Sequence, residues 1–329
     1  MEKGEQMADL SITYMGLKLK NPLVLGSSTI TMEIDGVKKA CDHGIGAVVL
    51  KSLFEEELKG KEAPYPELYH PEAYEYAYTD ASLIYGPSKY LEFIKKVKKN
   101  STVPIIASVN CQATKWWTNY SEEIAEAGAD GLELNISYLS FDKHDNPEDI
   151  EKRYIDIVMA IKNKIKIPVG VKIGYYFTSI PRIADKLKKA GADALILFNR
   201  YFKMGINLDN FTFEAENVFS HEYEIYDVLR WVGIVHSQVD IDIAASTGVW
   251  TPSDAIKYII SGAKVVQAVS SIKKMGFEHI EKIIRGISEY MDKKGINNLE
   301  KLRGIANKDI EWTKSLERTQ YMKFAGGNF

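Results

Sequence analysis

The sequence predicts an α/β fold: a (β/α)₈ TIM barrel that spans residues 1–329 as one domain, with a long insertion after the second strand and a C-terminal extension. Two observations predict it. Eight short apolar runs alternate with helical patterns, and polar residues stand at or near the C-terminal end of each run. Continuous apolar strands separated by helices are typical of a parallel sheet covered on both faces.

The predicted strands are apolar runs of strand length, rich in Val, Ile, Leu and Ala. They are residues 22–28, 47–52, 105–110, 131–137, 169–174, 194–199, 242–247 and 265–271. Helical patterns lie between most of them, such as ITMEIDGVKKACDHG after the first strand and YLEFIKKVKK before the third.

A weak internal repeat marks the joints before several strands. HGIGAVVL, AGADGLEL, AGADALIL and SGAKVVQA each place a glycine shortly before an apolar run. Gly44, Gly128, Gly191 and Gly262 can adopt the left-handed conformation that ends a helix. Each joint therefore predicts a helix followed by a short loop and a strand.

The position of the polar residues favours a closed barrel over the alternative, a doubly wound open sheet. Strand ends in a barrel meet at one mouth, where active sites are built, whereas an open sheet concentrates its site at one switch point. All eight predicted strands end in polar residues: Ser27, Ser28, Lys51, Ser52, Asn110, Asn135, Ser137, Lys172, Asn199, Ser246, Thr247, Ser270 and Ser271.

Three segments exceed a minimal barrel, namely residues 54–90, 200–235 and 290–329. Long insertions after strands usually cover a site. The first insertion is rich in tyrosine, with Tyr65, Tyr69, Tyr74, Tyr76 and Tyr78. We expect these rings to pack against the barrel rim or a neighbouring subunit rather than to stack on a ligand.

Composition narrows the class of protein. The 42 basic and 45 acidic residues give a net charge of −3, so nothing indicates a nucleic-acid partner. No segment has the 18 apolar residues of a membrane span, and the N-terminus lacks a signal-peptide pattern. We therefore expect a cytoplasmic protein without a membrane partner. Two cysteines without CxxC spacing predict neither a disulfide framework nor a metal site.

The last two strand ends predict a phosphate site. Thr247 and Gly248 follow one strand and Ser270 and Ser271 end the next, and barrels commonly bind phosphate in the loops after strands seven and eight. The alternative is that Gly248 only relieves a turn and that the neighbouring Thr and Ser only cap a helix.

Two lysines end strands that are otherwise made of Val, Leu and Ile. A buried ammonium at Lys51 or Lys172 is costly unless an anionic or carbonyl-rich partner meets it. An ion pair with a neighbouring carboxylate such as Glu133 is one interpretation. Lys172 could alternatively form a Schiff base, as lysines inside aldolase barrels do.

The runs NPLVLGSS, LKS, LELNIS, VGVKI, LFN and STGV followed by DAIKYIISGAKVVQAVSS occur in the order typical of FMN-dependent dihydroorotate dehydrogenases. The chain resembles that family over residues 10–305. The resemblance implies FMN at the barrel mouth, with Lys172 near N1 and the C2 carbonyl of the flavin. The cofactor-binding residues it implies are Gly26, Ser27, Lys51, Ser52, Asn135, Lys172, Asn199, Thr247, Gly248, Ser270 and Ser271.

The chain departs from the family pattern on the substrate side. The family has Asn-Leu-Ser-Cys-Pro-Asn, with Cys or Ser as the base, whereas this chain has Asn135-Ile136-Ser137-Tyr138-Leu139-Ser140. Tyr138 is a poor base because the pKa of a phenol is ordinarily about 10. The family's substrate loop after the second strand is also absent. The candidate catalytic residues are Lys172, Ser137, Tyr138 and His144, although a histidine in a loop is more often only solvated.

The candidate substrate-binding residues are Asn110, Asn135, Asn199 and Arg200. Arg200 could clamp a carboxylate with two hydrogen bonds or pair with an acidic neighbour. Together these features predict an FMN-dependent dehydrogenase acting on CH–CH groups of a small carboxylated substrate, dihydroorotate or a relative. The alternatives are a Schiff-base aldolase using Lys172 and a flavin-carrying electron-transfer subunit. We expect a homodimer, with an electron-transfer partner subunit as a further partner.

Overall fold

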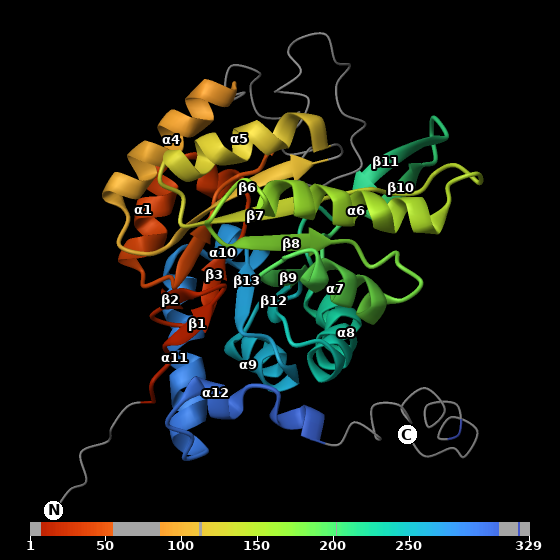
Figure 1. Ribbon diagram of the computed structural model, residues 1–329. Coiled ribbons are helices and arrows are strands. Elements are labelled where there is room, and N and C mark those ends of the chain that lie inside the picture. The colour runs from red at the N-terminus through yellow and green to blue at the C-terminus, as the bar shows by residue number, and fades with distance from the viewer. Residues whose placement is uncertain (1–7, 55–85, 112–113, 202, 309–321, 323–329) are drawn as a thin grey trace, which may run out of the picture.

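The computed structural model describes residues 8–54, 86–111, 114–201, 203–308 and 322, and its centre is a closed barrel of parallel strands (Figure 1). Strand β13 pairs with β3, and β4 pairs with both β3 and β6, which closes the ring. The barrel strands are β3 (Leu23–Leu25), β4 (Ala47–Val49), β6 (Ile105–Cys111), β7 (Gly131–Ile136), β8 (Val169–Ile173), β9 (Ala194–Leu197), β12 (Asp242–Ser246) and β13 (Val265–Ala268). The predicted barrel is confirmed, and the doubly wound alternative is wrong.

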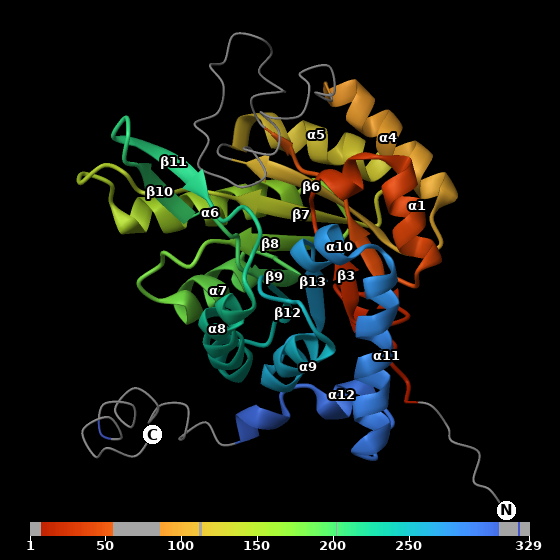
Figure 2. The ribbon, with the colours of Figure 1, turned by 180° about the vertical axis from the view of Figure 1, so that it is seen from behind.

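Helices surround this barrel and cover its outer face (Figures 1 and 2). They are α1 (Ile34–Asp42), α4 (Pro87–Asn100), α5 (Thr114–Glu126), α6 (Pro147–Lys162), α7 (Ile180–Lys189), α8 (Ile225–Gln238), α9 (Pro252–Ser261), α10 (Ser270–Met275) and α11 (Glu278–Lys293). Their starts follow local sequence signals: Asn146 caps α6 by accepting from the N–H of Glu148, and Pro147 follows it. Each helix buries one apolar stripe, as α4 does with Tyr90, Phe93, Ile94 and Val97.

The glycine joints behave as the repeat predicts. Gly44, Gly128, Gly191 and Gly262 all have positive φ angles, between 88° and 122°, directly after a helix. In two of these joints the next acidic residue holds the base of the barrel together. Asp193 accepts hydrogen bonds from Lys162 on α6 and from the N–H of Val169, which begins β8, each at 2.7 Å. Asp130 does the same for Lys98 and the N–H of Ile105.

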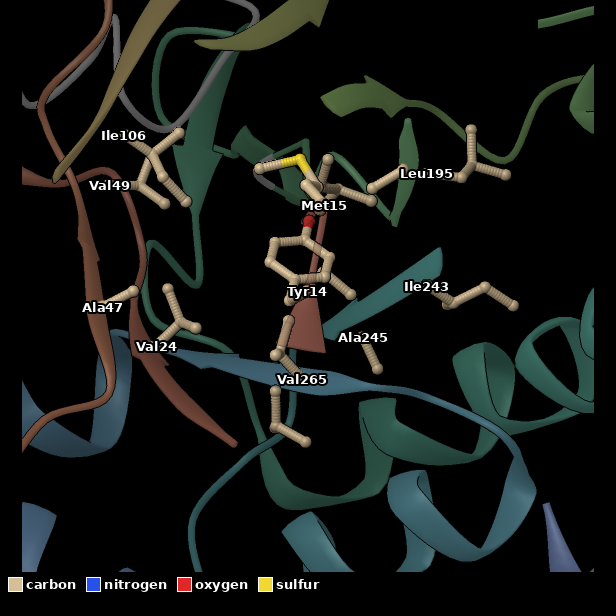
Figure 3. Close-up of a cluster of buried hydrophobic side chains, with 14 of the residues drawn as sticks. Tyr14, Met15, Val24, Ala47, Val49, Ile106, Leu195, Ile243, Ala245 and Val265 are labelled. Carbon is tan, nitrogen blue, oxygen red and sulfur yellow. The ribbon is translucent and has the colours of Figure 1, made fainter. Parts of the chain in front are cut away.

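A short hairpin closes the amino-terminal end of the barrel. Strands β1 (Ile12–Tyr14) and β2 (Leu17–Leu19) are joined at Met15 and Gly16, both with positive φ. Tyr14 and Met15 point in among buried side chains from several strands (Figure 3). A Cβ on Gly170 of β8 would lie 3.1 Å from the Met15 sulfur, so this strand needs glycine where the hairpin enters. Any ligand site must therefore lie at the opposite, carboxyl-terminal mouth.

The insertions add short elements at the mouth and at the C-terminus. Residues 29–32 form η1 (Thr29–Met32), and β5 (Leu53–Phe54) pairs in parallel with β6 near its C-terminal end. After β9 come the antiparallel strands β10 (Lys203–Asn207) and β11 (Thr212–Glu216), then η3 (Glu222–Glu224). Helix α12 (Leu299–Leu302) and η4 (Ile305–Lys308) follow α11. The tyrosines expected to pack at the rim lie outside the described residues. No helix in the described ranges is long and apolar enough to span a membrane.

We expect Asp193→Ala to lower the free energy of unfolding by about 1–3 kcal/mol, because a strand N–H and a lysine lose their shared acceptor. Asp185→Ala is the matched control, since Asp185 forms only an exposed pair with Lys189 within α7. That change should cost about 0.5 kcal/mol or less. Urea denaturation measures both values. Equal losses would show that the joint contributes no more than a surface ion pair.

Candidate functional site

The polar strand ends meet at the carboxyl-terminal mouth and line a cavity there. Its wall comes from β3, β8, β9, β12 and β13 and from the segments that follow β9 and β13. The space between these residues is about 740 Å³ when the open solvent at the mouth is included. The sequence-predicted residues in this wall are Ser27, Lys172, Asn199, Arg200, Thr247, Gly248 and Ser270.

A buried polar triad reaches the cavity wall through two of its members, Lys172 and Gln267. Gln267 on β13 donates from Nε2 to Glu133 Oε2 on β7 at 2.6 Å, and Lys172 Nζ on β8 lies 3.7 Å from Glu133 Oε1. The Lys172 and Glu133 side chains are only 10% and 3% exposed. The sequence interpretation of Lys172 as the partner of Glu133 is thus confirmed. Gln267 was missed, although a glutamine within an apolar strand is a signal that could have found it.

Two asparagines form the next layer outward. Asn199 donates from Nδ2 to Asn135 Oδ1 at 2.6 Å, and both side chains are buried. Within the described ranges, Asn135 Nδ2 and Gln267 Oε1 have no hydrogen-bond partner. A buried polar atom without a partner costs about 1–3 kcal/mol, so such atoms beside a cavity indicate a polar ligand. Asn110 is buried opposite Asn135 in the register of β6 and β7.

Serines connect the ends of β3, β4 and β6. Ser27 Oγ lies 3.1 Å from Ser52 Oγ, which lies 2.9 Å from Ser108 Oγ. Lys51 is buried beside them, with Nζ 5.8 Å from the centre of the Phe54 ring. A Cβ on Gly26 would lie 2.9 Å from the Val269 side chain. This side of the mouth therefore offers hydroxyls and an ammonium around a backbone that approaches closely at Gly26.

The predicted phosphate side is built from strained loop backbone. Thr247 and Gly248 have φ angles of 80° and 72°, and Tyr258 donates to the carbonyls of Ser246 and Thr247. A Cβ on Gly248 would lie 2.6 Å from the Ile225 nitrogen, so only glycine fits there. Ser270 Oγ accepts from the N–H of Ser220, and Ser271 Oγ has no partner among the described residues.

Lys273 also lines the cavity, three residues after Ser270 on α10. Lys273 was not predicted from the sequence, because a lysine near the start of a helix is usually exposed to solvent. Its neighbour Lys274 is exposed and does not line the cavity. Both ammonium groups lie over the Phe219 ring, at 5.7 Å and 4.3 Å from its centre.

Arg200 lines the cavity but is already held by the loop that follows β9. It donates to both carboxylate oxygens of Glu224, at 2.8 and 3.0 Å, and to the carbonyls of residues 217, 218 and 219. The guanidinium also lowers the pKa of Glu224 against the opposing effect of burial. The structure thus supports the acidic-neighbour alternative over the substrate clamp.

The candidate acid–base residues after β7 point to different partners. Ser137 Oγ lies 3.0 Å from the hydroxyl of Tyr201, whereas the Tyr138 hydroxyl donates to Asp145 Oδ1 at 3.1 Å. Arg153 lies over the Tyr138 ring, 4.2 Å from its centre. His144 is exposed in the loop. Neither Tyr138 nor His144 lines the cavity, which is the solvated outcome that the sequence favours for His144. Tyr201 was not singled out from the sequence.

Comparison with known proteins agrees with this architecture. A family model described as dihydroorotate dehydrogenase matches residues 9–291. The chain is 29% identical over 314 residues to a "Dihydroorotate dehydrogenase B (NAD(+)), catalytic subunit" from Thermoplasma acidophilum, covering 91% of this chain and 99% of that protein. A protein of the same name from Pyrococcus abyssi is 27% identical, with the same coverage.

Two further comparisons concern a more distant relative and a solved structure. The "NAD-dependent dihydropyrimidine dehydrogenase subunit PreA" of Escherichia coli K12 is 24% identical over 333 residues, covering 94% of this chain and 80% of that protein. A solved structure of a DHODH from Eimeria tenella in complex with ferulenol superposes with a TM-score of 0.68 at 17% identity, covering 93% and 91% of the two chains. At that identity the structure supports the fold alone.

Proposed function

Because the chain belongs to the dihydroorotate dehydrogenase family, we propose that it is an FMN-dependent oxidoreductase acting on a CH–CH group of a small carboxylated substrate, dihydroorotate or a relative. The observation that carries this proposal is the pair of buried amide atoms without partners, Asn135 Nδ2 and Gln267 Oε1, beside the cavity. A flavin ring presents both donors and acceptors along one edge. These atoms, together with Lys172 in the cavity wall, suit such an edge.

The remaining polar groups fit the rest of FMN. Gly26, Ser27, Lys51 and Ser52 lie on one side of the mouth, where close backbone and hydroxyls suit the ring and ribityl chain. Thr247, Gly248, Ser270 and Ser271 suit the phosphate, and Lys273 adds a positive charge to them. When bound, FMN supplies a two-electron acceptor or donor for hydride. Lys172 would place positive charge where a reduced ring carries negative charge, and Asn135 and Asn199 would orient the ring or substrate.

The two alternative functions, an aldolase and a subunit that only carries electrons, fit the structure less well than an oxidoreductase does. An aldolase would use Lys172 as a nucleophile, but its ammonium already faces the Glu133 carboxylate. A flavin-carrying subunit that only passes electrons needs no substrate-side polar groups. All three relatives named above are described as subunits, so an electron-transfer partner subunit remains part of the proposal. The single domain of residues 1–329 and the homodimer are predictions; for the latter, sedimentation would show a particle of twice the 37.2 kDa chain mass.

The phosphate side can be tested with two neighbouring lysines. Lys273→Glu puts a carboxylate in the cavity wall, and we expect FMN affinity to fall by about 10- to 100-fold, which is roughly 1.4–2.8 kcal/mol. Lys274→Glu is the control because this side chain has the same charge and also lies over Phe219 but outside the cavity wall. Flavin fluorescence during titration of the apoprotein measures both. Full affinity in Lys273→Glu would place the phosphate elsewhere.

Lys172→Met should lower the reduction potential of the bound flavin by about 30 mV or more, a tenfold effect for two electrons, because the anionic reduced ring loses its positive neighbour. Lys172→Arg retains the charge and should stay closer to the parent. Spectroelectrochemical titration gives the potentials. Borohydride trapping of a substrate on Lys172 would instead establish the aldolase.

We expect dihydroorotate to reduce the bound flavin slowly, because Tyr138 occupies the family's base position and its hydroxyl is bonded to Asp145. Loss of a general base costs about 10²- to 10⁴-fold in rate. Anaerobic stopped-flow absorbance measures the bleaching. Rapid saturable reduction at neutral pH, at about 1 to 10³ per second, would mean that another group accepts the proton without hindrance.

A further inference from the structure

Two polar contacts stand one above the other across β8 at the barrel mouth. The lower joins Asn135 to Asn199, and the upper joins the Ser137 hydroxyl to the Tyr201 phenol at 3.0 Å. Each partner of the upper contact follows its counterpart in the lower one by two residues. Since side chains two apart on an extended chain face the same way, Ser137 and Tyr201 continue the inner face of the barrel outward.

The chain makes room for this upper contact. Strand β8 ends at Ile173, and Gly174 follows where the Tyr201 ring passes over the strand end. A Cβ on Gly174 would lie 3.3 Å from Tyr201 Cε2 and 3.4 Å from its hydroxyl oxygen. Gly174 thus has the one side chain small enough to admit the ring without displacing it.

Aromatic contacts connect this pair to the cavity. Tyr176 packs on the Tyr201 ring, with the centroids 5.6 Å apart, and also contacts Tyr175. Tyr175 in turn meets Phe198, which lines the cavity, with an edge contact at 5.9 Å. Ser137 is only half-buried, whereas Tyr201 is 9% exposed. Ser137 is thus the more exposed of the two residues, although neither of them is part of the cavity wall itself.

The phenol is held in its protonated form. Burial raises the pKa of Tyr201, the hydrogen bond with Ser137 lowers it, and the neighbouring Tyr176 raises it again, with a net rise above the ordinary value of 10. Tyr154 on α6 is another titratable neighbour of Tyr201, and its own pKa is raised by its burial and by Tyr201. A group that stays protonated at neutral pH can supply a proton but cannot accept one.

We propose that Ser137 and Tyr201 form a proton relay that protonates a substrate carbon, so that this mouth favours reduction of a C=C bond over its formation. The inference rests on the proposed function and names the acid of the same site. The serine is the group that meets the substrate, and Tyr201 acts through it.

A bound reduced flavin would supply the hydride that adds to one carbon of the substrate double bond. The displaced electron pair on the neighbouring carbon would take the Ser137 Oγ proton and form the second C–H bond. The Ser137 oxygen recovers a proton from the Tyr201 hydroxyl. The resulting phenolate takes a proton from water. Two electrons and two protons are accounted for, and the flavin is the only oxidised partner.

The reverse reaction, oxidation of dihydroorotate, requires that the Ser137–Tyr201 pair has already lost one proton, so that it can accept the proton from the substrate carbon. Oxidation of dihydroorotate should therefore accelerate as the pH rises toward the raised pKa of Tyr201, whereas reduction of orotate should stay fast at neutral pH and fall only at alkaline pH. The same asymmetry explains why the chain dispenses with a Cys at position 138.

The test uses the flavin-loaded protein and Tyr201→Phe, which keeps the ring and removes only the hydroxyl. Reoxidation of the dithionite-reduced flavin by orotate and by uracil is followed anaerobically in H₂O and D₂O mixtures. We expect Tyr201→Phe to slow reoxidation by about 10- to 100-fold and to change the dependence on deuterium content from that of two protons in motion to that of one. Tyr176→Phe is the matched control: it packs on the same ring, its hydroxyl contacts Tyr175, and it should retain the parent rate.

A second variant and a titration distinguish an effect on proton transfer from an effect on substrate binding. Ser137→Cys introduces a thiol, which ordinarily has a pKa of about 8.5 and loses its proton far more readily than a serine hydroxyl, so it should speed dihydroorotate oxidation at mildly alkaline pH. Ultraviolet difference titration against Tyr201→Phe should show the Tyr201 pKa moving further up in Ser137→Ala, because the serine hydrogen bond that lowers it is gone. This second readout requires no substrate.

The two possible failures can be told apart. If the parent protein reacts with a pyrimidine and Tyr201→Phe behaves like Tyr176→Phe in rate, isotope dependence and pH profile, the relay is wrong and the proposed function stands. If the parent reacts with neither orotate nor uracil and its flavin is not bleached by dihydroorotate, the proposed function fails and the relay falls with it. An unchanged Tyr201 titration in Ser137→Ala would also overturn the relay.

Discussion

The mouth of this barrel depends on one buried carboxylate. Glu133 lies on β7 with almost no exposure, and a lone charge there would cost several kcal/mol. Gln267 reaches it from β13, on the opposite side of the ring, and Lys172 reaches it from the adjacent strand. The contact therefore ties opposite walls together above the hydrophobic plug of the β1–β2 hairpin. It also fixes the position of the Lys172 ammonium at the cavity wall.

The alternation of a strand turns this single contact into an organised site. Residues 133, 135 and 137 of the β7 segment face the barrel axis in turn, while Leu132, Leu134 and Ile136 are buried. The inner face thus reads carboxylate, amide, hydroxyl from the core outward. Each group finds its partner on another wall: Gln267, then Asn199, then Tyr201. The sequence of this strand is typical of a buried core strand, yet the strand ends in polar residues because its last residues leave the hydrophobic core and enter the barrel mouth.

The strands and their polar ends could be predicted because their signals are local. Gly128 and Gly191 mark helix ends whatever the rest of the chain does, and an apolar run of strand length needs no partner to be recognised. The residues that were missed depend on distant contacts. Tyr201 has meaning only because Gly174 leaves space and Ser137 lies within reach. The sequence left two roles open for Arg200 because Glu224, 24 residues later, lies beside it only after the loop has folded.

The segment after β9 joins the two halves of the site. Near its start lie Arg200, which binds the loop carbonyls and Glu224, and Tyr201, which contacts Ser137. Further along, the N–H of Ser220 binds Ser270 at the phosphate side, and its carbonyl accepts from Trp250. The Arg200 tie therefore sets the position of both ends of one loop. A change that moves this loop should therefore disturb the Ser137–Tyr201 contact and the Ser220–Ser270 contact together.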